Sequence, residues 1–323
     1  MRVLVTGGAG FIGSNFLRLL ARERPSWELV NFDLLTYAAA PQTLPVLAAL
    51  PRYRLVQADI ADAAAVDAEL ARGVDAVVHF AAESHVDRSL EGPAAFVRTN
   101  ILGTQVLLAA ALHHRVGRYV QVSTDEVYGS LGPTGFFSEE SPLRPSSPYA
   151  ASKASADLLV GAWHHSFALP ALITRCSNNY GPYQHPEKLM PRMILRALAD
   201  RPLPVFGDGR NIRDWIHVED HCRGVLAALE HGRPGQVYNF GGSEERENLW
   251  VANEILARLQ KPASLLSFVP DRLGHDRRYA VDATRARTEL GWAAPRSFAE
   301  GLSHTVAWYA QNRHWWEGLH PDP

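Results

Sequence analysis

The sequence predicts an α/β protein, built on a doubly wound parallel sheet with a smaller C-terminal lobe. Three observations support this fold class. A glycine-rich segment directly follows the first apolar run, short apolar runs alternate with helical stretches through the first half, and the composition changes after Arg175. The apolar runs are continuous rather than alternating, which is typical of strands that are buried on both faces of a parallel sheet.

The first 175 residues contain the expected strands and helices in alternation. Strands are expected at residues 3–5, 28–32, 53–57, 76–80, 119–122 and 171–174. Helices are expected between them, among others at residues 12–23, 61–72 and 96–114. Right-handed crossovers between parallel strands would place these helices on both faces of the sheet.

The remaining residues indicate a second lobe. Its loops are long and rich in proline, glycine and asparagine, as in SNNYGPYQHPEK and LPVFGDGRN. We expect a first domain at residues 1–175 and a mainly substrate-binding lobe at 176–323. Two segments, RDWIHVED and VYNFGG, look like strands of the large sheet, so parts of residues 212–240 are expected to return to it. A helix over residues 298–312 is expected to begin with a capping box of Ser297 and Glu300.

Composition argues against several classes of protein. The 323 residues carry a formal net charge of −2 and no basic run, which argues against a nucleic-acid or anionic-membrane partner. With no signal peptide before Val3 and no apolar run long enough to span a bilayer, we expect a soluble cytoplasmic protein. We also expect no metal. The two cysteines make no metal cluster, and adjacent histidines on a helix, as in His113–His114 and His164–His165, should point apart.

A glycine-rich loop, VLVTGGAGFIGSN, joins the first expected strand to the first helix. Gly7, Gly10 and Gly13 have the spacing G-x-x-G-x-x-G, and G-x-G-x-x-G begins at Gly8. Such glycines permit a tight turn and let the backbone approach a diphosphate, which the start of a helix attracts. Asp33 follows 33 − 13 = 20 residues after the last glycine, where a carboxylate binds an adenosine ribose and repels a 2′-phosphate. The sequence therefore predicts a Rossmann-type site that prefers NAD to NADP.

The segment SSPYAASKASADLL is typical of a helix start, with Ser147 as N-cap and Pro148 as the first helical residue. Tyr149 and Lys153 are four residues apart and share one helix face. A lysine ammonium beside a phenol lowers the pKa of the phenol, so this tyrosine can take a proton from a sugar hydroxyl while hydride leaves for nicotinamide. The Y-x-x-x-K spacing is common by chance. After this glycine loop it indicates a catalytic pair.

The segment VSTDEVYG ends an apolar strand with two hydroxyls and two carboxylates. Ligands of open α/β sheets bind at the carboxyl ends of strands, so Thr124 is expected to bond the same substrate oxygen as Tyr149. Asp125 and Glu126 would then lie against the sugar, where two carboxylates with separated pKa values serve as acid and base. Considered alone, the two carboxylates would be interpreted as a solvated turn.

These motifs resemble the extended short-chain dehydrogenase/reductase superfamily and, within it, the dTDP-glucose 4,6-dehydratase family. The resemblance covers nearly the whole chain, in TGGAGFIGSN, AAESHVDRS, STDEVYG, YAASKASAD, SNNYGPYQHPEK, RDWIHVEDH and GHDRRYAVD. The Thr-Asp-Glu triplet is the discriminating part, since related epimerases keep the tyrosine and lysine but lack the acid pair.

The resemblance implies an activity. Tyr149, assisted by Lys153 and Thr124, deprotonates the glucosyl 4-hydroxyl as NAD⁺ takes the C4 hydride. Glu126 then removes the C5 proton, Asp125 protonates the departing C6 hydroxyl, and hydride returns to C6 from NADH. The product is a 4-keto-6-deoxy sugar, and the cofactor is regenerated in each turnover.

The resemblance also implies binding residues. Those expected at the cofactor are Gly7, Gly10, Phe11, Ile12, Gly13, Asp33, Leu34, Thr36, Asp59, Ile60, Ala81, Ala82, Ser84, Thr99, Tyr149, Lys153 and Asn179. Those expected at the nucleotide sugar are Ser84, His85, Thr124, Asn178, Lys188, Leu189, Pro204, Val205, Phe206, Arg213, Asn248, Arg272 and His275. The cationic members suit a diphosphate. From the residues alone, Asp59 is nearly as well explained as a helix N-cap. The chain departs from the family at Leu34, often lysine, and at Leu273, commonly proline.

The resemblance further implies a homodimer that pairs the helices at 96–114 and 148–166, although their amphipathic faces could equally belong to the core. Two other functions stay open from the residues. One is 4-epimerisation or decarboxylation of a UDP-sugar, and the other is an NAD-binding regulator without catalysis. Thymidine as the base follows from the resemblance alone, and the downstream deoxysugar pathway stays undetermined.

Overall fold

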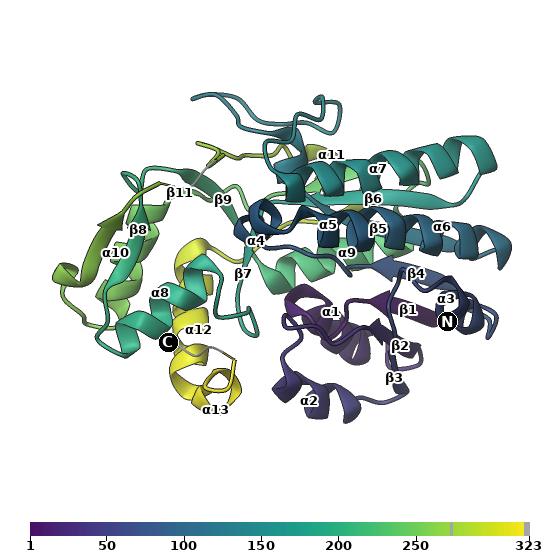
Figure 1. The fold of residues 1–323 in the computed structure, drawn as a ribbon, viewed down its shortest axis with the longest axis horizontal. Coiled ribbons are helices and arrows are strands. Elements are labelled where there is room, and N and C mark those ends of the chain that lie inside the picture. The colour runs from purple at the N-terminus through teal and green to yellow at the C-terminus, as the bar shows by residue number, and fades with distance from the viewer. Residues whose placement is uncertain (272–273, 320–323) are drawn as a thin grey trace.

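A seven-stranded parallel sheet forms the centre of the computed structural model, which describes residues 1–271 and 274–319 (Figure 1). The strand order is β10-β6-β5-β4-β1-β2-β3. The strands are β1 (Arg2–Thr6), β2 (Glu28–Asp33), β3 (Tyr53–Gln57), β4 (Ala76–His79), β5 (Arg118–Thr124), β6 (Ala171–Cys176) and β10 (Val237–Phe240). The order reverses between β1 and β4, where open α/β sheets bind ligands. The predicted doubly wound sheet is confirmed.

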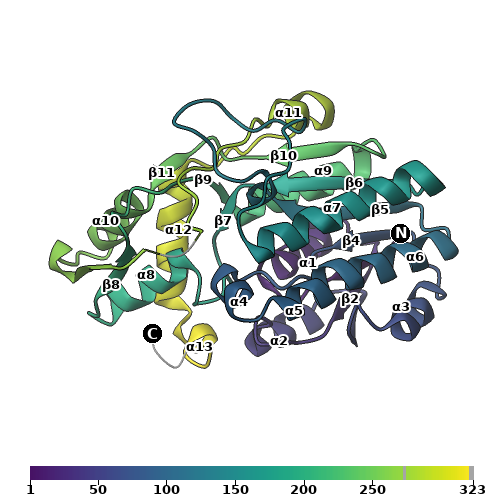
Figure 2. The same cartoon turned by 45° about the horizontal axis from the view of Figure 1, so that its top comes forward.

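Helices cover both faces of this sheet (Figures 1 and 2). On one face, Val3 and Val5 pack in a cluster with α1 (Phe11–Glu23), α9 (Val218–His231) and α11 (Thr284–Leu290). On the other, Leu4 packs in a cluster with α3 (Ala63–Leu70), α6 (Thr104–His113) and α7 (Pro148–Phe167). Successive residues of a strand point to opposite faces, so a sheet covered on both sides requires the continuous apolar runs seen in the sequence.

One long helix runs without a break from Pro93 to His113. It comprises α5 (Pro93–Phe96), a π-helical segment η2 (Val97–Gly103) and α6. With 21 residues it is long and apolar enough to cross a membrane, so the expectation that no apolar run reaches that length is wrong. A single such helix is weak support for a membrane span, because core helices of soluble proteins meet the same criteria.

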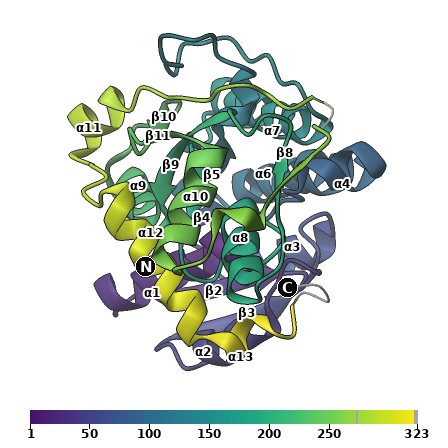
Figure 3. The ribbon, with the colours of Figure 1, turned by 90° about the vertical axis from the view of Figure 1, so that its left-hand side faces the viewer.

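The smaller lobe lies beside the carboxyl ends of the sheet strands, and Figure 3 shows it from the front. Its strands form two small sheets, β11-β9-β7 and β12-β8, made of β7 (Asn178–Tyr180), β8 (Leu203–Phe206), β9 (Ile212–His217), β11 (Glu245–Glu247) and β12 (Leu266–Val269). A separate core joins them to α8 (Leu189–Leu198), α10 (Asn248–Arg258), α12 (Phe298–Gln311) and α13 (Arg313–Trp316).

The chain after residue 175 contributes to both lobes. The expectation for VYNFGG is confirmed, because β10 pairs with β6 at the edge of the large sheet. RDWIHVED does form a strand, β9, but the expectation that it belongs to the large sheet is wrong, because β9 pairs with β7 and β11 in the smaller lobe. The capping box of α12 is present, with Ser297 and Glu300 bonded reciprocally. The domain division at residue 175 stays a prediction.

Candidate active site

The glycine loop brings three segments of backbone into close contact. Gly7 has a φ of +69°, and a Cβ there would lie 2.6 Å from the backbone nitrogen of Ala81, just after β4. A Cβ on Gly13, in the first turn of α1, would lie 2.3 Å from the carbonyl oxygen of Gly7. Gly10 is the N-cap of α1. Only glycine lets the helix start, the loop and the end of β4 approach this closely.

Asp33 ties the end of β2 to the glycine loop. Its carboxylate accepts the N–H of Ala9 at 2.8 Å and the N–H of Leu35 at 2.8 Å. Burial raises the pKa of Asp33, and these two backbone hydrogen bonds act in the opposite direction. The side chain predicted to bind a ribose therefore also holds the loop in place.

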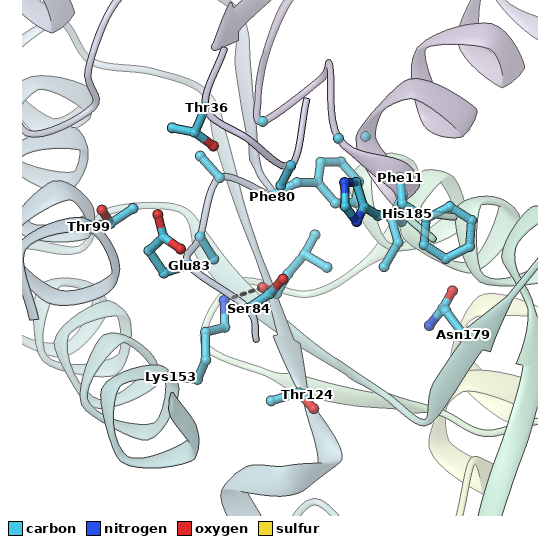
Figure 4. Close-up of a pocket in the computed structure, with 18 of the residues that line it drawn as sticks. Phe11, Thr36, Phe80, Glu83, Ser84, Thr99, Thr124, Lys153, Asn179 and His185 are labelled. Atoms are coloured by element: carbon cyan, nitrogen blue, oxygen red, sulfur yellow. Dashed lines mark hydrogen bonds between the residues drawn. The ribbon is translucent and has the colours of Figure 1, made fainter. Parts of the chain in front are cut away.

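Every residue expected at the cofactor lines one cavity at the carboxyl ends of the sheet strands (Figure 4). Thr124, Asp125 and Glu126 line the same cavity. So do side chains that were not predicted as site residues, among them Phe80, Glu83, Ser123, Cys176, Ser177, Gln184, His185 and Glu187. Most of these are single polar or aromatic residues in loops, which have no periodicity that would have identified them.

Of the two carboxylates after β5, Asp125 is buried and Glu126 is half-buried, so they do not form a solvated turn. Residues Asp125–Tyr128 form a 3₁₀-helix, η3, whose first free N–H, that of Glu126, is accepted by the Thr124 hydroxyl at 3.2 Å. Asp125 is only 2% exposed. Burial raises its pKa well above the usual range, the charges of Glu126 and Asp214 add to this, and Arg213 opposes it. These effects favour the protonated form of Asp125, which is the form that can act as an acid.

The catalytic pair predicted on α7 is buried beside β5. Ser147 caps the helix by accepting the N–H of Ala150 at 3.1 Å, as expected. The Lys153 ammonium donates to the carbonyl of Val122 at 2.8 Å, the contact dashed in Figure 4. Tyr149 shares the cavity.

The expected lowering of the Tyr149 pKa is wrong for this structure. Burial raises the pKa of the phenol well above its ordinary value, the charge of Glu126 adds to the rise, and a hydrogen bond with Thr124 opposes it. Burial also lowers the pKa of Lys153. Desolvation and the charge of Glu126 outweigh the hydrogen bond with Thr124, and neither could be known from spacing along a helix.

A second cavity adjoins the first and extends into the smaller lobe. Of the residues expected at the nucleotide sugar, it is lined by Ser84, His85, Asn178, Lys188, Leu189, Pro204, Phe206, Arg213, Asn248 and His275. The two cavities share Ser84, Glu126, Asn178, Asn179, Gln184, Glu187 and Lys188. Lys188 bridges the lobes by donating to the carbonyl of Ser84 at 2.9 Å. The two cavities are therefore adjacent, and between them they are lined by residues from the glycine loop to the smaller lobe.

Three expected substrate residues differ from this arrangement. The Val205 side chain is buried and does not line the cavity, because Pro204 and Phe206 on either side of it point to the other face of β8. Thr124 lines the first cavity only. Arg272, like the departure at Leu273, lies outside the described residues.

Several polar residues of the second cavity were missed. Tyr279 and Asp276 line it, and both belong to the segment GHDRRYAVD, of which only His275 was predicted to bind the substrate. The Arg213 guanidinium lies 4.5 Å from the centre of the Tyr279 ring and donates to the carbonyl of Asp276 at 2.9 Å. Beside it in β9, Asp214 is buried, its carboxylate accepts the N–H of Glu244 at 2.9 Å, and burial raises its pKa to about 7.

The expectation that adjacent histidines on a helix point apart, which was the reason for excluding a metal, is also wrong at one pair. The ring centres of His113 and His114 lie 4.7 Å apart instead of pointing away from each other. His114 is the C-cap residue that follows the last turn of α6. This pair lies away from the two cavities.

The fold and the site define a member of the extended short-chain dehydrogenase/reductase superfamily. A family model described as GDP-mannose 4,6 dehydratase matches residues 4–305. The dTDP-glucose 4,6-dehydratase of Streptomyces niveus is 51% identical over 323 residues, 99% of this chain and 96% of that protein. The chain belongs to this dehydratase family and, within it, to the dTDP-glucose 4,6-dehydratases.

Solved structures show the same likeness. The dTDP-glucose 4,6-dehydratase of Streptomyces venezuelae with NAD bound is 52% identical, with a TM-score of 0.96 over 99% of this chain and 100% of that one. The UDP-glucuronic acid 4-epimerase of Bacillus cereus, in complex with UDP-glucuronic acid and NAD, is 31% identical, with a TM-score of 0.91 over 96% and 99%. The fold is therefore common to dehydratases and epimerases, and the site residues must distinguish them.

Proposed function

We propose that this protein converts dTDP-glucose to its 4-keto-6-deoxy derivative by dehydration, with a retained and recycled NAD. One observation carries the proposal. The Asp125–Glu126 pair is placed at the end of β5 in the same cavity as Tyr149 and Lys153. Elimination of water across two neighbouring sugar carbons needs one acid and one base, and these two carboxylates supply them beside the pair that handles the 4-hydroxyl.

The residues at the glycine loop fit NAD. A Cβ at Gly7 or Gly13 would collide with backbone, so glycine at both positions lets the loop pack closely against the start of α1, the end of a helix that attracts a diphosphate. The Asp33 carboxylate at the end of β2 suits a ribose and disfavours a 2′-phosphate. When bound, NAD supplies reversible hydride transfer and, in its oxidised form, a positive charge, and positive charge nearby lowers the pKa of a phenol.

The chain's own groups move the protons. Tyr149 takes the proton of the sugar 4-hydroxyl, held by Thr124, while the Lys153 ammonium supports the phenolate. Glu126 takes the C5 proton, which a 4-ketone acidifies. Asp125, whose protonated form is favoured by burial and by its acidic neighbours, gives its proton to the leaving 6-hydroxyl. Removing either member of this acid–base pair should cost on the order of 10²–10⁴ in rate.

The second cavity is assigned to the nucleotide sugar. Lys188, Arg213 and His275 line it together with Asn248, and cationic side chains suit the diphosphate. The relatives named for dTDP-glucose support thymidine as the base.

The test is incubation of the purified protein with dTDP-glucose, without added NAD, followed by mass and NMR analysis of the sugar. Loss of one water and a 4-keto-6-deoxy product are expected. An epimer, loss of carbon dioxide, or unchanged sugar even with NAD supplied would refute dehydration of this substrate.

The division of roles has its own test. Glu126→Gln keeps the shape of the side chain but removes the base, so exchange of the C5 hydrogen with deuterated water should stop while the sugar nucleotide still binds. Asp125→Asn is the matched variant: it leaves the C5 base in place, so exchange should persist while product formation falls. Undiminished exchange in Glu126→Gln would show that another group is the base.

We also propose a homodimer. Large apolar side chains remain exposed on the two helices expected to pair, with Val97 at 54%, Leu102 at 43% and Leu158 at 65% exposed. An isologous pairing of these helices would cover them. A molecular mass of one chain by light scattering would exclude it. The cytoplasmic location stays a prediction.

A further inference from the structure

A group of metal-ligating side chains lies at the C-terminal end of α6, away from both cavities. Within residues 1–271 and 274–319, the ligand atoms of Asp67, His113 and His114 all lie within 4.8 Å of one another. His114 Nε2 is 2.7 Å from Asp67 Oδ1, and the two imidazole rings are inclined at 82°. Side chains from two separate elements, α3 and the end of α6, thus lie next to one another.

The backbone that carries these side chains is held by the core. Val66, next to Asp67 on α3, is fully buried in the same apolar cluster as Leu107 and Ala111 of α6. After His114 the chain turns back, and the N–H of Val116 donates to the carbonyl of Ala111 at 2.9 Å. Binding therefore needs adjustment of side-chain torsions only, which lowers its entropic cost.

The donor set selects a class of ion. Two imidazole nitrogens and one carboxylate oxygen suit Zn²⁺ and its neighbours Co²⁺, Ni²⁺ and Cu²⁺, whereas Mg²⁺ and Ca²⁺ prefer oxygen alone. Three protein ligands leave a fourth position for water, and Asp67 and His113 are exposed enough to admit it.

The spacing is compatible with a tetrahedral ion. At bond lengths of about 2.0–2.2 Å, the ligand atoms around such an ion lie about 3.4 Å apart. The observed spacings, 2.7 Å for the Asp67–His114 hydrogen bond and at most 4.8 Å overall, fall on either side of that value. A metal ion would replace the proton between Asp67 and His114. We propose that Asp67, His113 and His114 bind one divalent ion of the zinc type, which joins α3 to α6.

The chain offers a matched control. His164 and His165 are also adjacent on a helix, near the end of α7, but among the described residues they belong to no such group. His164 Nδ1 is instead 2.9 Å from the carbonyl oxygen of Leu169. Two neighbouring histidines without a carboxylate therefore occur in the same molecule.

The test is calorimetric titration of untagged, chelator-treated protein with Zn²⁺, together with the absorption spectrum of the Co²⁺ form. One ion per chain is expected, with affinity reduced at least about tenfold in His113→Ala and in Asp67→Asn, and unchanged in His165→Ala. Far-UV circular dichroism and the NAD content of each variant check that folding is intact. Absence of binding, equal affinity in Asp67→Asn, or an equal loss in His165→Ala would overturn the proposal.

Discussion

Replacing Asp214 with asparagine should remove one source of pH-dependent instability. Burial raises the pKa of this carboxyl from 3.8 to about 7 in the folded chain. Well below pH 4 it is protonated in both states. As the pH rises from about 4 to about 7, the unfolded chain releases the proton and the folded chain keeps it, so the free energy of unfolding falls. Above that range Asp214 is ionised in both the folded and the unfolded chain, and the free energy of unfolding falls no further on its account.

The size of the effect follows from the shift. The difference 7 − 3.8 is about 3 pKa units, and at 1.36 kcal/mol per unit it corresponds to about 4 kcal/mol, as an upper limit. Between pH 4 and pH 8 the wild-type protein should therefore lose up to about 4 kcal/mol more than Asp214→Asn. Any constant cost of the amide, for example against the N–H of Glu244, cancels in this comparison.

The assay is urea unfolding of both proteins across this pH range, with the difference between their free energies plotted against pH. Asp208→Asn is the control, because Asp208 is fully exposed and its pKa is lowered, first by its hydrogen bond with Arg277. Its contribution to stability is present at neutral pH and lost as the pH falls, opposite to that of Asp214. A difference between wild type and Asp214→Asn that does not change with pH would refute the reasoning.

Three further substitutions have defined outcomes. Gly7→Ala places a Cβ on a left-handed backbone position, 2.6 Å from the nitrogen of Ala81, so the purified protein should contain little NAD. The NAD content is measured chromatographically after denaturation, and full NAD content would contradict the close approach. Arg175→Ala leaves the 1% exposed Asp157 carboxylate without its partner, and should cost about 3–5 kcal/mol in denaturant unfolding; a loss below about 1 kcal/mol would show that the pair is not needed. Ser297→Ala removes half of the α12 capping box and should cost about 1 kcal/mol in the same measurement, whereas no loss would mean that water replaces the hydroxyl.

The large sheet was predictable because its physical requirement is visible in the residues. Strands covered on both faces must be largely apolar, and residues 3–5 and the first three residues of the segment 76–80 have that composition. The sheet to which β9 belongs was not predictable in the same way. Its apolar run resembles that of β10, and only the pairing with β7 and β11 places it in the smaller lobe.

The site, too, has features that could be predicted from the sequence and features that could not. Spacing identified the glycine loop, Asp33 and the Tyr149–Lys153 pair, because each motif is local. The direction of the Tyr149 pKa, by contrast, depends on burial and on the charge of Glu126, which follow from packing of distant segments. The expectation that Val205 binds the substrate was wrong for a local reason. Alternate residues of β8 face opposite sides, and the sequence alone does not show which side faces the cavity.

The repeated passage of the chain between the two lobes has a mechanical consequence. The chain leaves the sheet after β6, returns through α9 and β10, leaves again for β11 and α10, returns as α11, and leaves once more as α12. A pair of lobes joined by one linker can rotate as rigid bodies about a hinge. Where the backbone crosses between the lobes several times, these connections resist such rotation. Access to the two adjacent cavities should therefore be controlled by loops and side chains at their rims, and the two lobes should keep one mutual orientation through the catalytic cycle.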